Sequence, residues 1–260
     1  MLDNQLKKAE ELFLEEKYKE SKETYESIIH LINNRDAEHT YGICLVRLNE
    51  YNKAINVFNN IIKKYGEEGD VWYSLGRTYL IVDDINKAIN CLNKAKQLIP
   101  NNSKVFLYLG IAHEKLQNTD MAIKNYIASL NLEEYYETHI NLGLCYYDIQ
   151  ELSLALKHTK RAFEIENKNL DSLRYYVFML VKTNQREEAY KLLLDTSLSY
   201  DEDASILETF ILLALNVRDF KKADKAYERL KSINPTHPTV GDYKMLKTIA
   251  TVKNIDVFKC

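Results

Sequence analysis

The chain has 260 residues, a formal net charge of −3, and 46% hydrophobic residues. This nearly balanced charge argues against a general nucleic-acid binder, which needs a strongly basic surface to neutralise phosphates. No run of about 18 apolar residues occurs, so we expect no direct insertion into a membrane. Only three prolines and seven glycines are present, which suits a chain that is helical throughout.

The N-terminal segment, MLDNQLKKAEELFLEEKYKE, has the pattern of an acidic amphipathic helix, with Leu6, Ala9 and Leu12 as packing positions. It does not have the continuous apolar stretch of a secretory signal. These features together predict a cytoplasmic protein. A second helix follows, with Ser21 and Tyr25 among its packing positions.

The clearest pattern begins at Trp72. Together with Leu75 and Tyr79, this residue occupies positions i, i+3 and i+7, which form one face of a helix. Ala88 and Leu92 lie four residues apart, on one face of a second helix. The segment therefore predicts two helices joined by a short connection.

The residues between and after these two helices indicate how they pair. Asp83 and Asp84 suit a turn or a helix cap. Gly76 and Ala88 have almost no side chain, so the two helices can approach closely where these positions meet. Pro100 ends the second helix. The result is a helical hairpin with one apolar side uncovered.

This hairpin pattern recurs along the chain. The small position of the second helix returns after 33, 34, 34, 33, 34 and 34 residues, at Ser21, Ala54, Ala88, Ala122, Ala155, Ala189 and Ala223. The small position of the first helix has the same intervals, at Ala9, Gly42, Gly76, Gly110, Gly143, Val177 and Ile211. Two independent series in register predict seven repeated hairpins.

On these residues the chain resembles the tetratricopeptide repeat family, whose pattern is W-x2-L-G-x2-Y, then A-x3-F, then P, within 34 residues. The resemblance implies an all-α fold, a right-handed superhelical solenoid of about seven tetratricopeptide hairpins with a C-terminal capping helix. We expect a single array over residues 1–260, with the capping helix at 238–253. The repeats are then 2–34, 35–68, 69–102, 103–135, 136–169, 170–203 and 204–237.

Some repeats depart from the family pattern. Lys8 stands where the first repeat needs an apolar residue, and Thr159 stands at the usual aromatic position of the fifth. Val177 and Ile211 replace the glycine in the sixth and seventh repeats. End repeats of such arrays are commonly degenerate, because one side faces solvent.

The residues that carry catalysis or bind metals do not form a recognisable pattern. The four cysteines include no C-x-x-C pair, and we expect Cys44 and Cys145 to be buried thiols and Cys260 to be exposed. The helix that begins HEKLQ at His113 has Gln117 where a zinc-protease motif needs its second histidine. We therefore predict no enzyme, no cofactor and no metal.

In the tetratricopeptide family the first helix of each hairpin lines a concave groove, and the resemblance implies that this groove binds another protein or a peptide. Lysine is missing from the positions that grip a terminal carboxylate in some family members. An apolar groove suits a helix or an extended hydrophobic segment. The side chains expected in the groove are His39, Ile43, Tyr73, Arg77, Leu107, Ile111, Ile140, Asn141, Leu144, Arg174 and Phe178.

The apolar members of this set form a row that we expect to be exposed in a monomer, and such patches usually mark binding sites. Folding of a terminal helix or tight curvature of the solenoid is the structural alternative, because either would bury part of the row. Arg77 and Arg174, near the two ends of the row, could pair with acidic groups of a peptide.

The two ends of the chain carry opposite charge, which allows weak self-association. Nine basic and four acidic residues lie from Arg218 to Lys253, against five basic and eight acidic residues from Met1 to Asn34. Three functions are therefore open. The first is a scaffold or adaptor that binds a partner polypeptide, the second is a structural subunit of a larger or self-associating assembly, and the third is an unrecognised enzyme or small-ligand sensor.

Overall fold

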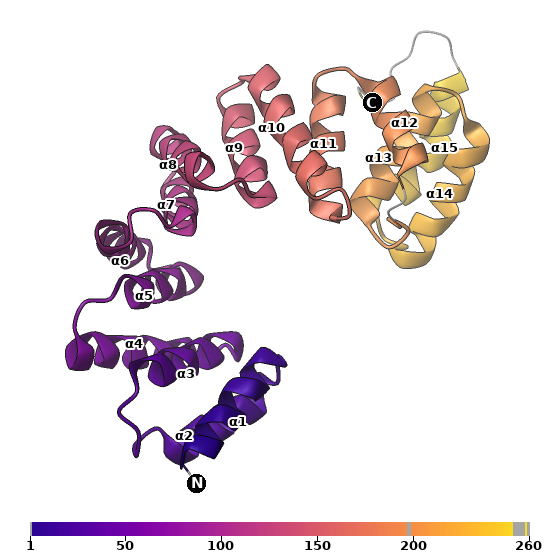
Figure 1. Cartoon of the computed structure of the whole chain (residues 1–260). Helices are drawn as coiled ribbons and strands as arrows, with labels where there is room; N and C mark the ends of the chain where they lie inside the picture. The colour runs from indigo at the N-terminus through magenta and orange to yellow at the C-terminus, as the bar shows by residue number, and fades with distance from the viewer. Residues whose placement is uncertain (1, 197–198, 252–257, 259–260) are drawn as a thin grey trace. The chain divides into compact units, whose positions relative to one another are not determined.

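The computed structural model describes residues 2–196, 199–251 and 258. This part of the chain contains fifteen α-helices and no strand (Figure 1). The prediction of an all-α fold built from tetratricopeptide hairpins is confirmed. The helices are α1 (Leu2–Leu14), α2 (Tyr18–Ile28), α3 (Arg35–Arg47), α4 (Tyr51–Tyr65), α5 (Gly69–Ile81), α6 (Ile85–Leu98), α7 (Ser103–Lys115), α8 (Thr119–Leu132), α9 (Tyr136–Asp148), α10 (Leu152–Ile165), α11 (Leu170–Lys182), α12 (Arg186–Asp195), α13 (Ala204–Asn216), α14 (Phe220–Ile233) and α15 (Pro238–Thr251).

The helices group into two compact units. Unit 1 comprises residues Met1–Glu134 and contains α1 to α8, and unit 2 comprises Tyr135–Cys260 and contains α9 to α15. In both units an odd-numbered helix packs against the even-numbered helix that follows it, and each hairpin packs against the next. The helix α15 follows the last hairpin and packs against α13 and α14. Residues 252 and 253 of the expected capping helix lie outside the described residues.

The turn inside each hairpin has the same backbone conformation. One residue with a φ near +60° follows each first helix, at Glu16, Asn49, Asp83, Gln117, Gln150, Asn184 and Arg218. This left-handed conformation lets the next backbone N–H reach back into the helix, as Asp84 N does to Tyr79 O at 2.9 Å. The seven turn residues are separated by the same intervals as the two small positions, so every hairpin closes in the same way.

Small residues allow the two helices of a hairpin to approach closely, as the sequence predicts. A Cβ atom placed on Gly110 would lie 2.4 Å from Cε1 of Tyr126, and one on Gly42 would lie 2.5 Å from Cε1 of Phe58. Both distances are far below van der Waals contact. The aromatic ring of the second helix therefore fills the space that the missing side chain leaves.

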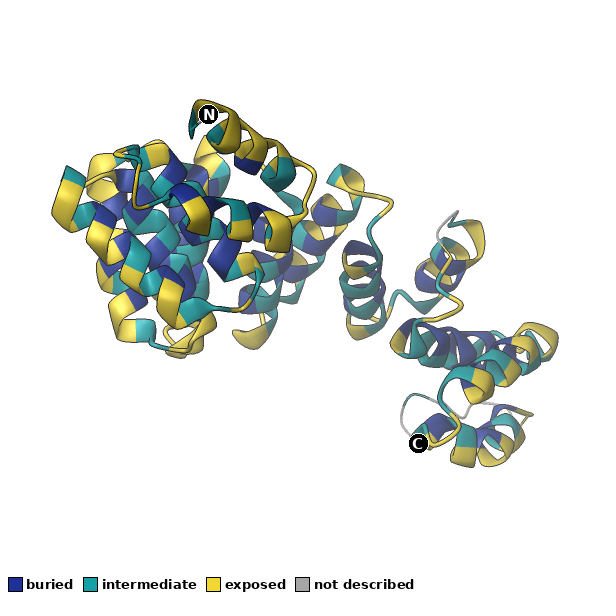
Figure 2. Ribbon diagram, turned by 90° about the horizontal axis from the view of Figure 1, so that it is seen from below, coloured by how far each residue is buried: buried dark blue, intermediate teal, exposed yellow. Residues whose placement is uncertain are grey.

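Buried residues form stripes that face the neighbouring helices (Figure 2). In the fifth repeat the departure from the family pattern is accommodated, because Thr159 is fully buried and donates its hydroxyl to Ala155 O at 3.0 Å. The expected burial of Cys44 and Cys145 is confirmed, and both are free thiols. Cys260 lies outside the described residues.

Candidate functional site

A pocket of about 480 Å³ opens between α3 and α5 in unit 1. Four of the residues that the sequence predicts for the groove line it, namely His39, Ile43, Tyr73 and Arg77. We call it the unit 1 pocket. Its other lining residues are Val46, Arg47, Asn49, Phe58, Asp70, Ser74, Thr78, Ile81 and Asn102.

A polar cluster joins α3 to α5 along one side of the unit 1 pocket. The imidazole of His39 lies 2.8 Å from Ser74 Oγ through Nε2 and 3.5 Å from an Asp70 oxygen through Nδ1. Arg35 donates to the other oxygen of Asp70. Burial lowers the pKa of His39 below its usual range, although Asp70 acts in the opposite direction. His39 is therefore neutral at pH 7, and its ring links the two helices.

The guanidinium of Arg77 lies over two tyrosine rings. Its central carbon is 5.4 Å from the ring centre of Tyr73 and 4.7 Å from that of Tyr108. These two rings meet edge to face at 5.7 Å. The Nε atom of Arg77 is buried and has no hydrogen-bond partner. The electron-rich faces of the two rings attract the cation and hold the guanidinium in place.

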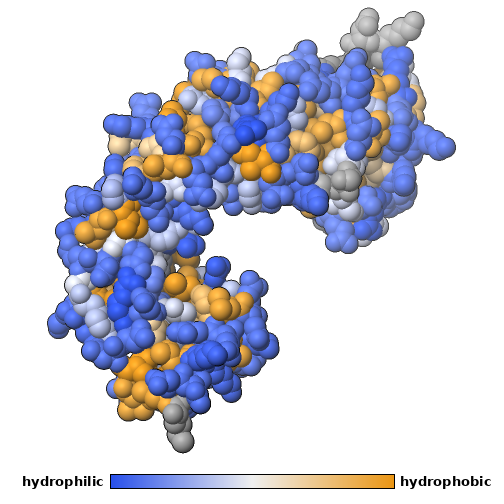
Figure 3. Space-filling model, in the orientation of Figure 1, coloured by the Kyte–Doolittle hydropathy of each residue, from blue (hydrophilic) through white to orange (hydrophobic). Residues whose placement is uncertain are grey.

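Apolar groups form the rest of the unit 1 pocket. Phe58 is fully buried and forms the base together with the half-buried Ile43, and Ile81 is exposed at 48%. On the face of the molecule shown in Figure 3, hydrophobic side chains form separate patches between hydrophilic ones. The pocket thus combines an apolar base with cationic and amide groups.

The expectation of a continuous exposed row is wrong at two positions. Leu107 on α7 is only 8% exposed and Ile140 on α9 only 6%, so both are buried. Ile111 on α7 and Leu144 on α9 are half-buried, and Ile111 packs against the apolar cluster that joins α5, α6 and α7. Part of the row is therefore buried, as the structural alternative anticipated.

In unit 2 the predicted groove residues already have partners in the chain. Arg174 on α11 forms ion pairs with Asp171 at 2.6 Å and with Asp203 at 2.5 Å. Its guanidinium is therefore engaged, which corrects the expectation that it is available to a peptide. Phe178 meets the ring of Tyr147 edge to face at 5.3 Å. Asn141, on α9, is half-buried.

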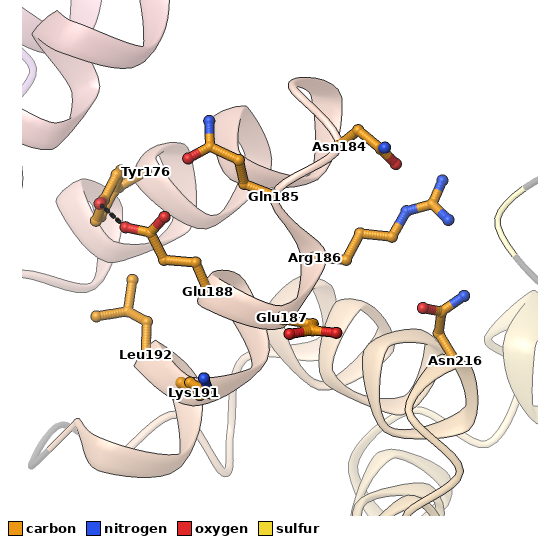
Figure 4. Close-up of a pocket in the computed structure, with 9 residues that line it drawn as sticks. All are labelled: Tyr176, Asn184, Gln185, Arg186, Glu187, Glu188, Lys191, Leu192 and Asn216. Carbon is orange, nitrogen blue, oxygen red and sulfur yellow. Dashed lines mark hydrogen bonds between the residues drawn. The ribbon is translucent and has the colours of Figure 1, made fainter.

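A larger pocket of about 760 Å³ lies beside α12 in unit 2, and Figure 4 shows its lining residues. None of the predicted groove residues belongs to it. Its side chains carry both signs of charge, including Arg186, Glu187 and Glu188. Tyr176 donates to Glu188 at 3.1 Å, and burial of its hydroxyl is the main cause that raises its pKa to about 12. The sequence analysis did not single out this pocket, whose lining residues come from α11, α12, α13 and the turn between α11 and α12.

Sequence reasoning also missed part of the unit 1 pocket. Arg47 and Ile81 lie one helical turn after Ile43 and Arg77, so extending the groove positions by four residues would have identified them. Asn102 precedes α7 in the next repeat, and only the packing of one hairpin on another brings it here. Among the described residues, no group of three or more His, Cys, Asp or Glu side chains could hold a metal ion.

Two family models for the tetratricopeptide repeat match the chain, over residues 36–67 and 69–102. These segments contain α3 to α6, the helices that build the unit 1 pocket. The chain therefore contains repeats of the tetratricopeptide repeat family. Tetratricopeptide repeats generally bind protein partners, and proteins of this family and fold are typically interaction scaffolds rather than enzymes.

Known proteins resemble the chain over most of its length. BBSome complex member BBS4 from Bos taurus is 26% identical over 92% of the chain, and the chain spans about half, 53%, of that relative. A structure titled as a functional characterization of Pseudomonas aeruginosa pilF has a TM-score of 0.69 at 16% identity, covering 81% of the chain and 96% of pilF. YrrB, described as a TPR protein with an unusual peptide-binding site, has a TM-score of 0.60 at 16% identity, covering 72% of the chain and 97% of YrrB.

The likeness to pilF and YrrB establishes the fold alone. Among the described residues, none of the helices is both long enough and apolar enough to cross a membrane.

Proposed function

We propose that this tetratricopeptide repeat protein is an interaction scaffold or adaptor that binds a partner polypeptide through the first helices of its hairpins. The observation that carries the proposal is the unit 1 pocket, where residues chosen by repeat position alone, His39, Ile43, Tyr73 and Arg77, line one cavity. Its apolar base and half-buried walls suit a helix or an extended segment with hydrophobic side chains.

The proposal includes a cytoplasmic protein without catalytic activity, cofactor or nucleic-acid partner. Three cysteines, Cys44, Cys91 and Cys145, are buried as free thiols, which suits a reducing compartment. Burial raises the pKa of the Cys91 thiol to about 11, so it is protonated at neutral pH and poorly suited to nucleophilic chemistry.

A structural subunit of a larger assembly is the second candidate. It is supported by the relatives named as BBSome complex members, with which the chain aligns over most of its length. The opposite charges of the two chain ends also support weak self-association. Size-exclusion chromatography with light scattering distinguishes the two candidates, since a self-associating subunit has a mass above 30.4 kDa that depends on concentration.

Site-specific photo-crosslinking in cells tests the scaffold proposal. A photoreactive amino acid at position 43, in the unit 1 pocket, should capture a defined protein, and the same amino acid at Ile127 on α8 serves as the control. Ile127 is 40% exposed and belongs to a second helix. The captured protein, once purified, should bind the wild type and lose at least about tenfold in affinity for Ile43→Gln. Equal capture at both positions, or equal affinity for both proteins, would contradict the proposal.

A further inference from the structure

Two arginine side chains line the unit 1 pocket without an anionic partner. Arg47 ends α3 and Arg77 lies on α5, and among the described residues no carboxylate lies within ion-pairing distance of either guanidinium. Arg35 and Arg174, by contrast, each contact two aspartates closely. The unpaired state of Arg47 and Arg77 therefore distinguishes this pocket from the structural ion pairs of the fold.

Both guanidinium groups lie over tyrosine rings. Arg77 lies over Tyr73 and Tyr108, and Arg47 lies over Tyr18 with its central carbon 5.8 Å from the ring centre. A stacked guanidinium keeps its plane fixed and presents its donors at the edge, which suits bidentate binding of an oxyanion. Because the Nε of Arg77 is buried, the terminal NH2 groups of this guanidinium are the donors left for a ligand.

Two amide side chains in the pocket add further donors. The side-chain oxygen of Asn102 accepts the backbone N–H of Lys104, and that of Asn49 accepts the hydroxyl of Tyr51. Because both oxygens are occupied in this way, the amide NH2 groups are the atoms left for a ligand. They line the same pocket as the two arginines.

The acidic residue of the pocket does not cancel this positive charge. Asp70 is paired with Arg35, whose guanidinium contacts it directly, so the two neutralise each other. His39 contacts Asp70 but is neutral at pH 7. Arg47 and Arg77 therefore leave the pocket with about two uncompensated positive charges.

We propose that the unit 1 pocket receives a phosphoryl group carried by a phosphoserine or phosphothreonine in an apolar segment of the partner polypeptide. Two separate guanidiniums and two amide donors match a dianion with three acceptor oxygens better than a carboxylate with one negative charge. The apolar base takes the side chains next to the modified residue. This inference rests on the proposed function, since the same groove binds the partner.

Three synthetic peptides test the inference by isothermal titration calorimetry with the full-length protein. Each is a seven-residue peptide of valine, leucine and alanine with acetylated and amidated ends, and its central residue is phosphoserine, serine or glutamate. We expect the phosphoserine peptide to bind at least about tenfold more tightly than the other two, with an affinity that falls as salt is raised. Inorganic phosphate is a fourth probe and should bind more weakly than the phosphoserine peptide.

Variants identify the site. Arg47→Gln and Arg77→Gln should each lower the affinity for the phosphoserine peptide about tenfold, without changing the affinity for the serine peptide. Arg77→Lys keeps the positive charge but loses the planar pair of N–H donors. Its affinity for the phosphoserine peptide should therefore lie between those of Arg77→Gln and the wild type. Arg161→Gln is the matched control, because it removes one guanidinium from α10 in unit 2 and should change nothing.

Three results would overturn the inference: equal binding of the phosphoserine and serine peptides, equal binding of the glutamate peptide, or full phosphoserine affinity in the Arg47 and Arg77 variants. Binding of inorganic phosphate as tightly as the peptide would also overturn it, since the ligand would then be a free anion. None of these results touches the crosslinking at position 43, so the failure of this inference and that of the scaffold proposal are distinguishable.

Discussion

Units 1 and 2 share one repeat length but bury their apolar side chains differently. In unit 1 the buried residues fall into separate clusters, such as one that includes Leu45 and Phe58 and another that includes Leu92 and Leu109. In unit 2 one cluster runs from Leu173 to Ala250 and includes residues of α11 to α15, whereas the buried Leu142 and Ala155 of the first hairpin of this unit are not part of it.

The side chain at the first-helix small position explains much of this difference. Gly42, Gly76 and Gly110 bring the helices of unit 1 together, with the second helix supplying the larger side chain. In unit 2 the first hairpin keeps glycine at this position, as Gly143, but Val177 and Ile211 occupy it in the next two hairpins, where they are buried and add their own side chains to the cluster. Equal spacing therefore specifies a hairpin, whereas side-chain volume at one position decides how that hairpin shares its core with its neighbours.

The largest effect that we predict comes from replacing a glycine at the first-helix small position of unit 1 by valine, the residue at the corresponding position 177 of unit 2. Gly110→Val should destabilise the protein by about 3 kcal/mol, because the new side chain meets the buried ring of Tyr126. Trp72, the single tryptophan, lies on α5 in unit 1 and reports on that unit. In urea, the midpoint from tryptophan fluorescence should fall more than the midpoint from far-UV circular dichroism.

Gly241→Ala is the matched control for this substitution. Gly241 is a helical glycine of α15, and a Cβ atom placed there meets nothing within 4 Å. Alanine there should stabilise the protein by about 0.5 to 1 kcal/mol through helix propensity. A Gly110→Val protein as stable as the wild type would contradict the packing of unit 1.

The second largest effect on stability concerns two aspartates that cap helices, one in each unit. Asp203 caps α13 through Ile206 N and also pairs with Arg174, with only 11% of its side chain exposed. Asp84 caps α6 through Lys87 N and pairs only with Lys87, which is 61% exposed. Asp203→Ala should therefore cost about 2 kcal/mol and Asp84→Ala about 1 kcal/mol, measured by urea unfolding. Equal losses would mean that the Arg174 ion pair adds no stability.

The lowered pKa of Asp203 makes the stability that comes from its contacts with Arg174 and α13 depend on pH. Burial acts to raise this pKa, but hydrogen bonds from Arg174 and the α13 backbone outweigh it, so the pKa lies below its usual range. The folded state therefore binds the proton less tightly than the unfolded chain. The stability from Asp203 is present above about pH 4 and is lost as the pH falls through the folded pKa. In Asp203→Ala, the free energy of unfolding should therefore fall less steeply as the pH is lowered below about 4.

A histidine pair should make unit 2 sensitive to mild acid. His139 Nδ1 lies 2.9 Å from His158 Nδ1, and the ring of Tyr146 stacks on the ring of His158 at a centroid distance of 5.5 Å. Burial, the neighbouring His139 and Lys157 lower the pKa of His158 to about 4. The unfolded chain, with a pKa near 6.5, binds the proton more tightly.

Stability should therefore fall by about 1 to 2 kcal/mol as the pH is lowered from about 6.5 to 4, once solvent screening is allowed for. Circular dichroism melts across this range measure the loss, and His158→Phe should reduce it. Urea unfolding followed by Trp72 fluorescence should change less, because Trp72 belongs to unit 1. An unchanged slope in His158→Phe would show that this histidine does not titrate as expected.

The smallest effect concerns the turns, which the two units share. Gln117→Gly in unit 1 should stabilise the protein by about 0.5 to 1 kcal/mol, because glycine adopts a positive φ without steric cost. Asn184→Gly in unit 2 should give a smaller gain, since asparagine tolerates this conformation better than glutamine. Thermal melts of both variants measure the difference, and a loss of stability in Gln117→Gly would contradict the turn geometry.

The sequence alone determined the repeated hairpins. Small residues at intervals of 33 and 34 and apolar residues at helical spacing are local signals, and local hydrogen bonding and helix packing act on them directly. Four members of the unit 1 pocket also followed from the sequence, because His39, Ile43, Tyr73 and Arg77 occupy corresponding places in adjacent repeats. Periodicity can predict which face of a helix such residues share.

Tertiary structure decided what periodicity could not. The seven left-handed turn residues include glutamate, glutamine and arginine, so no glycine marks them, and their conformation follows from how each pair of helices packs. Leu107 and Ile140 have groove positions but are buried, and Arg174 is engaged by Asp203, which lies 29 residues away. Asn102 enters the pocket only because one hairpin packs on another. Burial and charge pairing depend on contacts between repeats, and repeat position alone does not encode them.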